Sequence, residues 1–124
     1  MKRGSVLRKE CELPMNFSEC AEKIERYFAA CDLSLVEQDF SALLHLWGRD
    51  EGYVYLSCTG GRKEWDFHWH KEADILLDMK IADFAAIANH QIDPLKAFTS
   101  GKIQAQGNVS LALRLYQTLL QQGL

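Results

Sequence analysis

Hydrophobic residues first recur at helical spacing after residue 16. Apolar positions appear every three or four residues from Phe17 to Cys31, and charged residues fall between them. Asn16 precedes this run and Glu19 lies three residues further on, which is the pattern of a capping box. The sequence therefore predicts an amphipathic helix over 17–31.

From about residue 42 the hydrophobic period shortens to two, which is typical of β-strands. Four alternating segments follow in quick succession, at about 43–47, 53–58, 65–70 and 74–79. Gly60-Gly61 supplies a turn between the second and the third. Short connections and alternation together predict an antiparallel meander with one buried face.

The helical period then returns for two short segments. Phe84 and Ile87 share one side of the first segment. Asp93 followed by Pro94 is the pattern of an N-cap with proline at the first helical position, and Gly101 is placed to end the second segment. We therefore expect two short helices after the meander.

A fifth strand over 102–106 and a last helix over 109–121 complete the pattern. The last helix has one narrow polar stripe, so it must bury two faces: one against the sheet and one against a ligand, a neighbouring helix or a partner chain. The sequence thus predicts an α/β (α+β) fold with a five-stranded, mostly antiparallel sheet. Its order is an N-terminal helix, a β-meander, two short helices, a fifth strand and a C-terminal amphipathic helix.

The composition fits one globular domain. The chain has 124 residues, of which 48% are hydrophobic and 25% charged, enough for one core. We expect residues 1–15 to be a loosely ordered segment and residues 16–124 to form the domain. A net charge of −3 gives no basic surface for nucleic acid. No apolar run is long enough to span a bilayer and no signal-peptide pattern is present, so we expect a cytoplasmic protein.

The four cysteines lack the C-x-x-C spacing of zinc and redox motifs. We expect them to be reduced. Cys20, Cys31 and Cys58 then act as small hydrophobic residues of the fold, and Cys11 belongs to the N-terminal segment.

The stretch from Asp74 to Gln117 combines several turn residues and apolar positions in a specific order. A strand is followed by the helix that holds Asp83 and Phe84, then by Asp93-Pro94 and the sequence Ala-Phe-Thr-Ser-Gly-Lys, a further strand, Gly107-Asn108 and an amphipathic helix. This stretch resembles the sterol-carrier-protein-2-like domain. The resemblance implies a helix-covered sheet that encloses an apolar tunnel. It also implies a non-catalytic carrier of a sterol, fatty acyl chain, phospholipid or isoprenoid quinone precursor.

An apolar pocket built from these elements would select its ligand by the apolar area that is buried. Tyr116 could orient one polar head group. The candidate lining residues are Phe84, Ile87, Phe98, Ile103, Leu111, Leu115, Tyr116 and Leu119.

Polar residues in the third predicted strand allow a different hypothesis, a metal site. Asp66, His68 and His70 would share one strand face, a spacing that can offer ligands to one divalent metal, and His45 could add another ligand. Without any metal, the alternation of polar and apolar residues also explains these positions, because they would form the solvent-facing side of the strand. In that case the buried side carries Trp65, Phe67 and Trp69.

Partner binding is a further alternative. Three aromatic residues, Trp47, Tyr53 and Tyr55, lie on the less apolar faces of the first two strands. They are either covered by the first helix or form a patch for a homodimer or transient membrane contact. The last helix could instead dock the chain on a partner enzyme. We expect no cofactor, because the glycines lack phosphate-loop spacing, and no catalysis, because no nucleophile–base signature is present.

Overall fold

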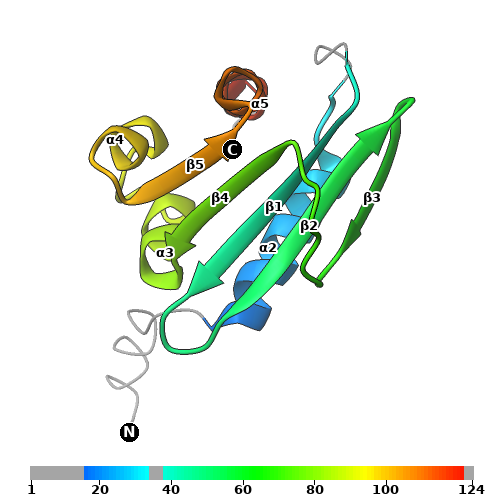
Figure 1. Ribbon diagram of the computed structural model, residues 1–124. Helices are drawn as coiled ribbons and strands as arrows, with labels where there is room; N and C mark the ends of the chain where they lie inside the picture. Colours follow the sequence, from blue (N-terminus) through cyan, green and yellow to red (C-terminus); the bar gives the residue numbers. More distant parts are fainter. Residues whose placement is uncertain (1–15, 34–37, 122–124) are drawn as a thin grey trace, which may run out of the picture.

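The computed structural model describes residues 16–33 and 38–121, so residues 1–15, including Cys11, lie outside the described part. One five-stranded sheet carries the helices on one side (Figure 1). The elements in chain order are α2 (Phe17–Ala30), β1 (Phe40–Trp47), β2 (Gly52–Thr59), β3 (Arg62–Asp66), β4 (Ile75–Lys80), α3 (Ile81–Ala88), α4 (Pro94–Thr99), β5 (Ile103–Gly107) and α5 (Val109–Gln121).

Helix α2 begins and ends on specific hydrogen bonds. The Asn16 side chain accepts from the Glu19 N–H at 2.8 Å, and the Glu19 carboxylate accepts from the Asn16 N–H at 3.1 Å, which confirms the predicted capping box. At the other end, the Lys63 ammonium of β3 donates to the carbonyl oxygens of Ala29 and Cys31. A cation at this end also opposes the negative pole of the helix dipole. Helix α2 is therefore tied to the sheet across a long sequence separation.

The sheet has the strand order β3-β2-β1-β4-β5. The pairs β1–β2, β2–β3 and β4–β5 are antiparallel, which confirms a mostly antiparallel five-stranded sheet, whereas β1 and β4 are parallel. The meander predicted for four strands is therefore right for three and wrong for the fourth. Residues 67–74 carry the chain from β3 across β2 and β1 instead of turning back in a hairpin (Figure 1).

The third strand is shorter than its sequence pattern predicts. It ends at Asp66, whose carboxylate accepts from the His68 N–H at 3.0 Å and contacts His70 Nε2 at 2.9 Å. These bonds turn the backbone away from the sheet, as short acidic side chains do in turns. Phe67 and Trp69 were expected in the core and are instead 41% and 58% exposed.

Strand residues alternate between two faces that differ in cover. The helix-covered face carries residues such as Leu46 and Val54, both fully buried beneath the helices. The open face has no helix over it within the described residues and carries His45 and Tyr55, among others; the 67–74 crossover lies over part of it, where His70 stacks on Tyr55 at 3.5 Å between ring centroids. The open face also carries Trp47 and Tyr53, so helix α2 does not cover Trp47, Tyr53 or Tyr55.

Three cysteines of the described part lie in the core in the reduced form, as predicted. They are Cys20, Cys31 and Cys58. Burial raises the pKa of Cys20 to about 11, and the negative charges of Glu19 and Asp50 act in the same direction. Such a thiol stays protonated near neutral pH and is a poor nucleophile.

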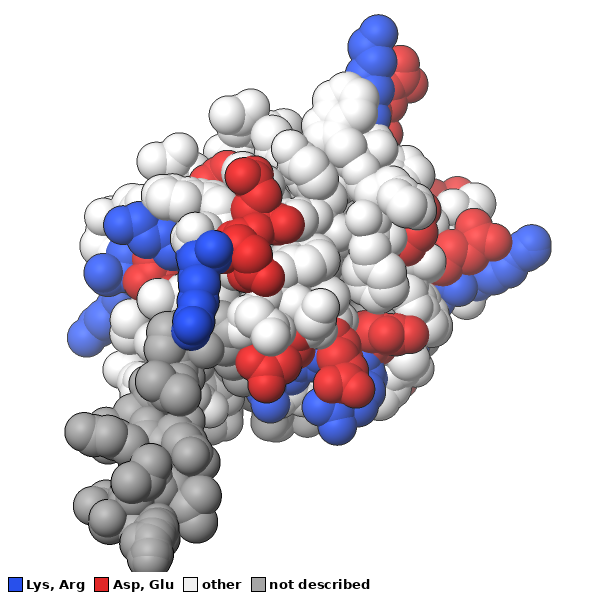
Figure 2. Space-filling view, turned by 90° about the horizontal axis from the view of Figure 1, so that it is seen from below, with Lys and Arg blue, Asp and Glu red and all other residues white. Residues whose placement is uncertain are grey.

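Helices in the described part of the chain are all too short or too polar to cross a membrane. Figure 2 views the molecule from the end where the β1–β2 turn lies, and acidic and basic side chains are interspersed on this surface. The exposed turn residues Arg49, Asp50 and Glu51 belong to this end. The surface in that view is not a continuous basic patch.

Gly107 joins β5 to α5 at a point where a side chain has no room. Its φ is +91°, and a Cβ at this position would lie 2.3 Å from the carbonyl oxygen of Asp74. Gly101 has a similar φ of +88°, but a Cβ there would meet no atom within 4 Å. Substituting each glycine by alanine therefore separates the effect of a positive φ on stability from the effect of a steric clash.

We expect Gly107→Ala to lower the free energy of unfolding by about 3 kcal/mol, because it adds a clash to the strain of a positive φ. Gly101→Ala should cost only about 1 kcal/mol, from the conformation alone. Urea unfolding followed by circular dichroism measures both values. Equal losses would contradict the close approach of Asp74 to Gly107.

Candidate functional site

An apolar cavity of about 280 Å³ lies on the helix-covered face, between α2 on one side and α4 and α5 on the other. The sheet forms its floor through residues of β1, β2, β4 and β5. Helix α2 contributes Ile24, Tyr27, Phe28 and the C-cap residue Cys31; the remaining lining residues are Leu33, Phe40, Ala42, Leu44, Leu56, Ile75, Leu77, Phe84, Pro94, Leu95, Phe98, Ile103, Ala105, Val109, Ala112, Leu113 and Leu115.

The structure brings four of the predicted lining residues together at this cavity: Phe84, Phe98, Ile103 and Leu115. Ile87 is half-buried elsewhere on α3, and Leu111 is only 1% exposed because it packs into the core. The side chains of Tyr116 and Leu119 lie outside the described part of the structure.

Sequence reasoning missed the contribution of α2 and of the sheet floor. Ile24 and Phe28 belong to the apolar stripe of α2, which was visible in the sequence as the buried side of a helix. Leu44 and Leu77 are cross-strand neighbours in β1 and β4. Because that pairing is parallel and non-local, no pattern in the sequence placed them under the same cavity.

The cavity wall offers a ligand few polar partners. No Asp, Glu, Lys, Arg or His side chain is part of the described lining. The Cys31 thiol donates to the Phe28 carbonyl oxygen at 3.2 Å, and burial raises its pKa, so it is a neutral and already bonded group. Binding inside the cavity therefore depends on apolar contact area and shape.

Exposed apolar side chains from three helices line this cavity where it reaches the surface. Tyr27 of α2, Leu95 of α4 and Leu113 of α5 are 39%, 45% and 39% exposed, and each also lines the cavity. We refer to these three residues as the cavity rim. The Lys23 ammonium lies 5.7 Å from the centroid of the Tyr27 ring, which places a positive charge beside the rim.

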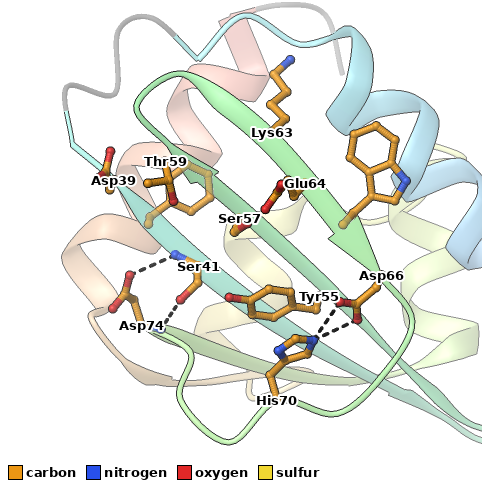
Figure 3. Close-up of a pocket in the computed structure, with 12 residues that line it drawn as sticks. Asp39, Ser41, Tyr55, Ser57, Thr59, Lys63, Glu64, Asp66, His70 and Asp74 are labelled. Atoms are coloured by element: carbon orange, nitrogen blue, oxygen red, sulfur yellow. Dashed lines mark hydrogen bonds and ion pairs between the residues drawn. The ribbon is translucent and has the colours of Figure 1, made fainter.

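A second hollow, of about 790 Å³ and polar, lies largely over the open face (Figure 3). Ser41, Tyr55 and Ser57 form part of its floor, and Asp66 and His70 border it where the crossover leaves the sheet.

The carboxylates around this polar hollow hold the backbone in place. Asp39 accepts from the Gly60 N–H at 2.9 Å, and Asp74 accepts from the Ser41 N–H at 2.9 Å while its own N–H donates to Ser41 Oγ. Burial alone would raise the pKa of Asp66, but hydrogen bonds from His70 and from the His68 N–H outweigh it and lower the pKa. These acids are partners of turns and of the crossover.

The proposed metal ligands do not converge. Asp66 and His70 contact each other at 2.9 Å, whereas the His68 side chain is exposed and contributes only its N–H to Asp66. His45 lies on β1, which does not neighbour β3. Among the residues that the structure describes, no group of three or more His, Cys, Asp or Glu side chains is arranged to hold a metal.

His45 is the centre of a separate polar cluster on the open face. Its Nδ1 lies 2.7 Å from Asp78 Oδ2 and its Nε2 lies 2.8 Å from Glu51 Oε2, while its ring stacks on Tyr53. Trp47 Nε1 donates to the other oxygen of Asp78 at 2.8 Å. Partial burial on its own would lower the pKa of His45, but the hydrogen bonds and charges of Asp78 and Glu51 outweigh it and raise the pKa.

A family model matches the sheet and the helices that follow it. Residues 41–120 match the model of the SCP-2 sterol transfer family. The chain therefore belongs to this family, which confirms the resemblance carried by residues 74–117.

Curated relatives share part of this chain. The human hydroxysteroid dehydrogenase-like protein 2 is 31% identical over 81 residues, which are 64% of this chain and 19% of that protein. Human sterol carrier protein 2 is 38% identical over 53 residues, 43% of this chain and 10% of that protein. The matched region thus spans no more than about a fifth of the curated relatives.

Solved structures share the fold along most of the chain. Palmitated SCP2L2 from Aedes aegypti has a TM-score of 0.71 at 18% identity and covers 85% of this chain and 95% of its own. The apo form of sterol carrier protein 2 from Yarrowia lipolytica has a TM-score of 0.55 at 18% identity, with 81% and 73% covered. At 18% identity, this similarity shows a shared fold.

The His45 cluster generates a prediction about pH and stability. Because the pKa of His45 is raised in the folded state, the cluster stabilises the fold below the ordinary histidine pKa of about 6.5, and this contribution is lost as pH rises through the folded value. We expect His45→Gln to destabilise the protein more at about pH 6 than at about pH 8.5.

Chemical unfolding at the two pH values measures the difference between the wild type and His45→Gln. The control is Glu51→Gln combined with Asp78→Asn, on which His45→Gln should have a much smaller pH-dependent effect. A loss that does not change with pH in the wild-type background would contradict this role of His45.

Proposed function

We propose that residues 16–124 form a non-catalytic domain that binds a hydrophobic ligand in the apolar cavity and transfers or sequesters it. The observation that carries this proposal is the cavity itself, which is bounded by α2, α4, α5 and the sheet, with no charged side chain in its described lining. An apolar cavity of this kind favours an apolar occupant over water. The cytoplasm is the location that we propose for this activity.

The size of the cavity narrows the ligand class. Its volume of about 280 Å³ lies just below the range of roughly 300–1,000 Å³ that is typical of ligand pockets. A single apolar chain fits this space better than the two chains of a phospholipid. A fatty acyl chain or a linear isoprenoid is therefore the first ligand to test, and a structural neighbour described as palmitated supports the same choice.

The polar groups of the described residues support a non-catalytic role. The pKa values of Cys20 and Cys31 are raised by burial, so neither thiol is activated as a nucleophile. The Asp66–His70 pair borders the polar hollow and does not line the apolar cavity. A ligand in the cavity is thus surrounded by groups that bury it without reacting with it.

One observation favours the second candidate function, docking on a partner enzyme through the last helix. Leu113 of α5 is 39% exposed although it is apolar. A relative named hydroxysteroid dehydrogenase-like protein 2 is consistent with an enzyme as the docking partner. Native mass spectrometry of the purified chain separates the candidates: a co-purified lipid supports the carrier, a stoichiometric metal supports a metal-dependent enzyme, and an empty chain that gains no mass with added fatty acid favours docking.

Filling the cavity should weaken ligand binding. Ala112 lines the cavity, so Ala112→Phe would occupy space that a ligand uses. Displacing two methylene groups of the ligand costs about 1.6 kcal/mol, which is more than tenfold in affinity. Leu115→Arg should abolish binding, because it would bury a charge against the ligand.

Titration with a fluorescent fatty acid measures both variants, and circular dichroism checks that they fold. Ser110→Phe is the matched control, because Ser110 is exposed on the same helix and is not among the lining residues. Its affinity should equal that of the wild type. Unchanged affinity in folded Ala112→Phe and Leu115→Arg would place the ligand elsewhere.

A further inference from the structure

Strand β5 is the last strand at one edge of the sheet (Figure 1). The Asn108 N–H, just after this strand, donates to the Asp74 carbonyl oxygen, just before β4, at 2.9 Å. Because the N–H and C=O groups of successive residues in a strand point to opposite sides, those of Ile103 and Ala105 face away from β4. Within the described ranges, 16–33 and 38–121, no hydrogen bond satisfies these outward groups.

The two edges of the sheet differ in charge. At the other edge, four of the five residues of β3 are charged: Arg62, Lys63, Glu64 and Asp66. Charged edge strands discourage pairing with another strand. Strand β5 has the sequence Ile-Gln-Ala-Gln-Gly, and Lys102 is the only charged residue from position 99 to position 112. The Lys102 ammonium lies 4.0 Å from the Asp83 carboxylate, which offsets its charge. Strand β5 therefore lacks the protection that β3 has.

The sequence of β5 is compatible with pairing to itself. In an antiparallel pair centred on Ala105, this residue faces Ala105 of a second copy, and Gln104 faces Gln106 of that copy. Both glutamines are exposed, and opposed amides can exchange hydrogen bonds. Strand β3 differs, because pairing it to itself about Glu64 would place two carboxylates opposite each other.

Helices α4 and α5 gain a contact in the same arrangement. A two-fold axis perpendicular to the sheet relates the two β5 strands and keeps both helix layers on one side. Helix α4 packs on β5 and α5 packs on β4, so these helices of the two copies face each other across the axis. Leu95 of α4 and Leu113 of α5 are 45% and 39% exposed. Pairing can bury this apolar surface.

Charge on these two helices is low. Lys96 is the charged residue of α4, whose N-cap is Asp93, and Arg114 is the charged residue of α5. The Asp93 carboxylate accepts from the Lys96 N–H at 3.3 Å, and Arg114 Nη1 donates to Gln38 Oε1 at 2.9 Å. Basic and acidic groups are both present there, so neither sign of charge dominates the surface beside β5.

We propose that two copies of this chain associate through strand β5, which pairs antiparallel with β5 of the second copy to form one continuous sheet. This inference goes beyond ligand binding and does not depend on the nature of the ligand. An extended segment of another protein would also satisfy the outward groups of Ile103 and Ala105. Such a segment would leave Leu95 and Leu113 exposed, whereas a second copy covers the edge and the helices together.

The size of this contact sets its expected strength. Stable interfaces bury roughly 800 Å² of each partner, and weak, transient ones bury less. A five-residue edge with two leucines beside it belongs to the smaller class. We therefore expect a reversible equilibrium between monomer and dimer, with a Kd of about 10 μM.

Sedimentation equilibrium of the full chain measures this Kd. Ala105→Pro removes an outward N–H and spares the bonds to β4, and proline is tolerated at such a position of an edge strand. We expect the variant to dimerise at least about tenfold more weakly. Circular dichroism checks that it folds. A wild type that remains monomeric at about 1 mM, or a folded Ala105→Pro that dimerises as the wild type does, would overturn the proposal.

Charge variants test the register and do not require a proline in the strand. Gln104→Glu combined with Gln106→Glu places like charges opposite each other twice, which should weaken the dimer by about tenfold. Gln104→Lys combined with Gln106→Glu places opposite charges in the same positions and should dimerise at least as tightly as the wild type. Equal affinities in these two variants would contradict the antiparallel pairing centred on Ala105.

Arg62→Glu is the matched control for net charge. It lowers the net charge by two, as the double glutamate variant does, but it lies on β3 at the other edge of the sheet. Its Kd for dimerisation should equal that of the wild type. A loss in Arg62→Glu as large as in the double glutamate variant would show that overall repulsion, and not β5, controls the association.

Discussion

Strand β1 must be covered on both faces, and much of the structure follows from this requirement. Leu43 and Leu46 point to opposite faces of the sheet and are 2% and 0% exposed. Helices cover the side of Leu46. On the side of Leu43, the paired residue Tyr55 and the crossover residue His70 stack together and extend the cover. A hairpin to the fourth strand would leave that side bare, whereas a parallel β1–β4 pair places the crossover above it.

The same arrangement explains why the core contains a cavity. Helix α2 packs over the β1–β2 half of the sheet through residues such as Ile24 and Phe28, while α4 and α5 pack on the β4–β5 half. The floor between them, which includes Leu44 and Leu77, is apolar and is only partly roofed. Apolar surface without packing partners lowers stability, so an apolar ligand that fills this space would complete the core and stabilise the fold.

The elements themselves could be predicted, because helix caps and hydrophobic periods are local. Asn16 and Glu19 set the start of α2 in the sequence as they do in the structure. The partner of β4 could not be predicted, since alternation records which face of a strand is buried and not which strand lies beside it. The end of β3 was missed because the carboxylate of Asp66, the last paired residue of the strand, bonds to the residues that follow it. Phe84 and Phe98 were expected near a pocket from their helical spacing and lie at the cavity, whereas Leu44 reaches it only through tertiary packing.

The division between the two faces also bears on selectivity. On the open face, polar groups such as Asp74 and Asp66 are already paired with the backbone and with His70, so they stabilise the crossover. On the helix-covered face, the cavity wall has almost no directional partners for a ligand, and contact area distinguishes chain lengths by only about 0.8 kcal/mol for each methylene. In the proposed function, discrimination between head groups arises at the cavity rim, where Tyr27 carries a hydroxyl and the Lys23 ammonium lies 5.7 Å from the centroid of its ring. The proposed carrier would therefore accept a range of apolar chains and select mainly by the part of the ligand that remains outside the cavity.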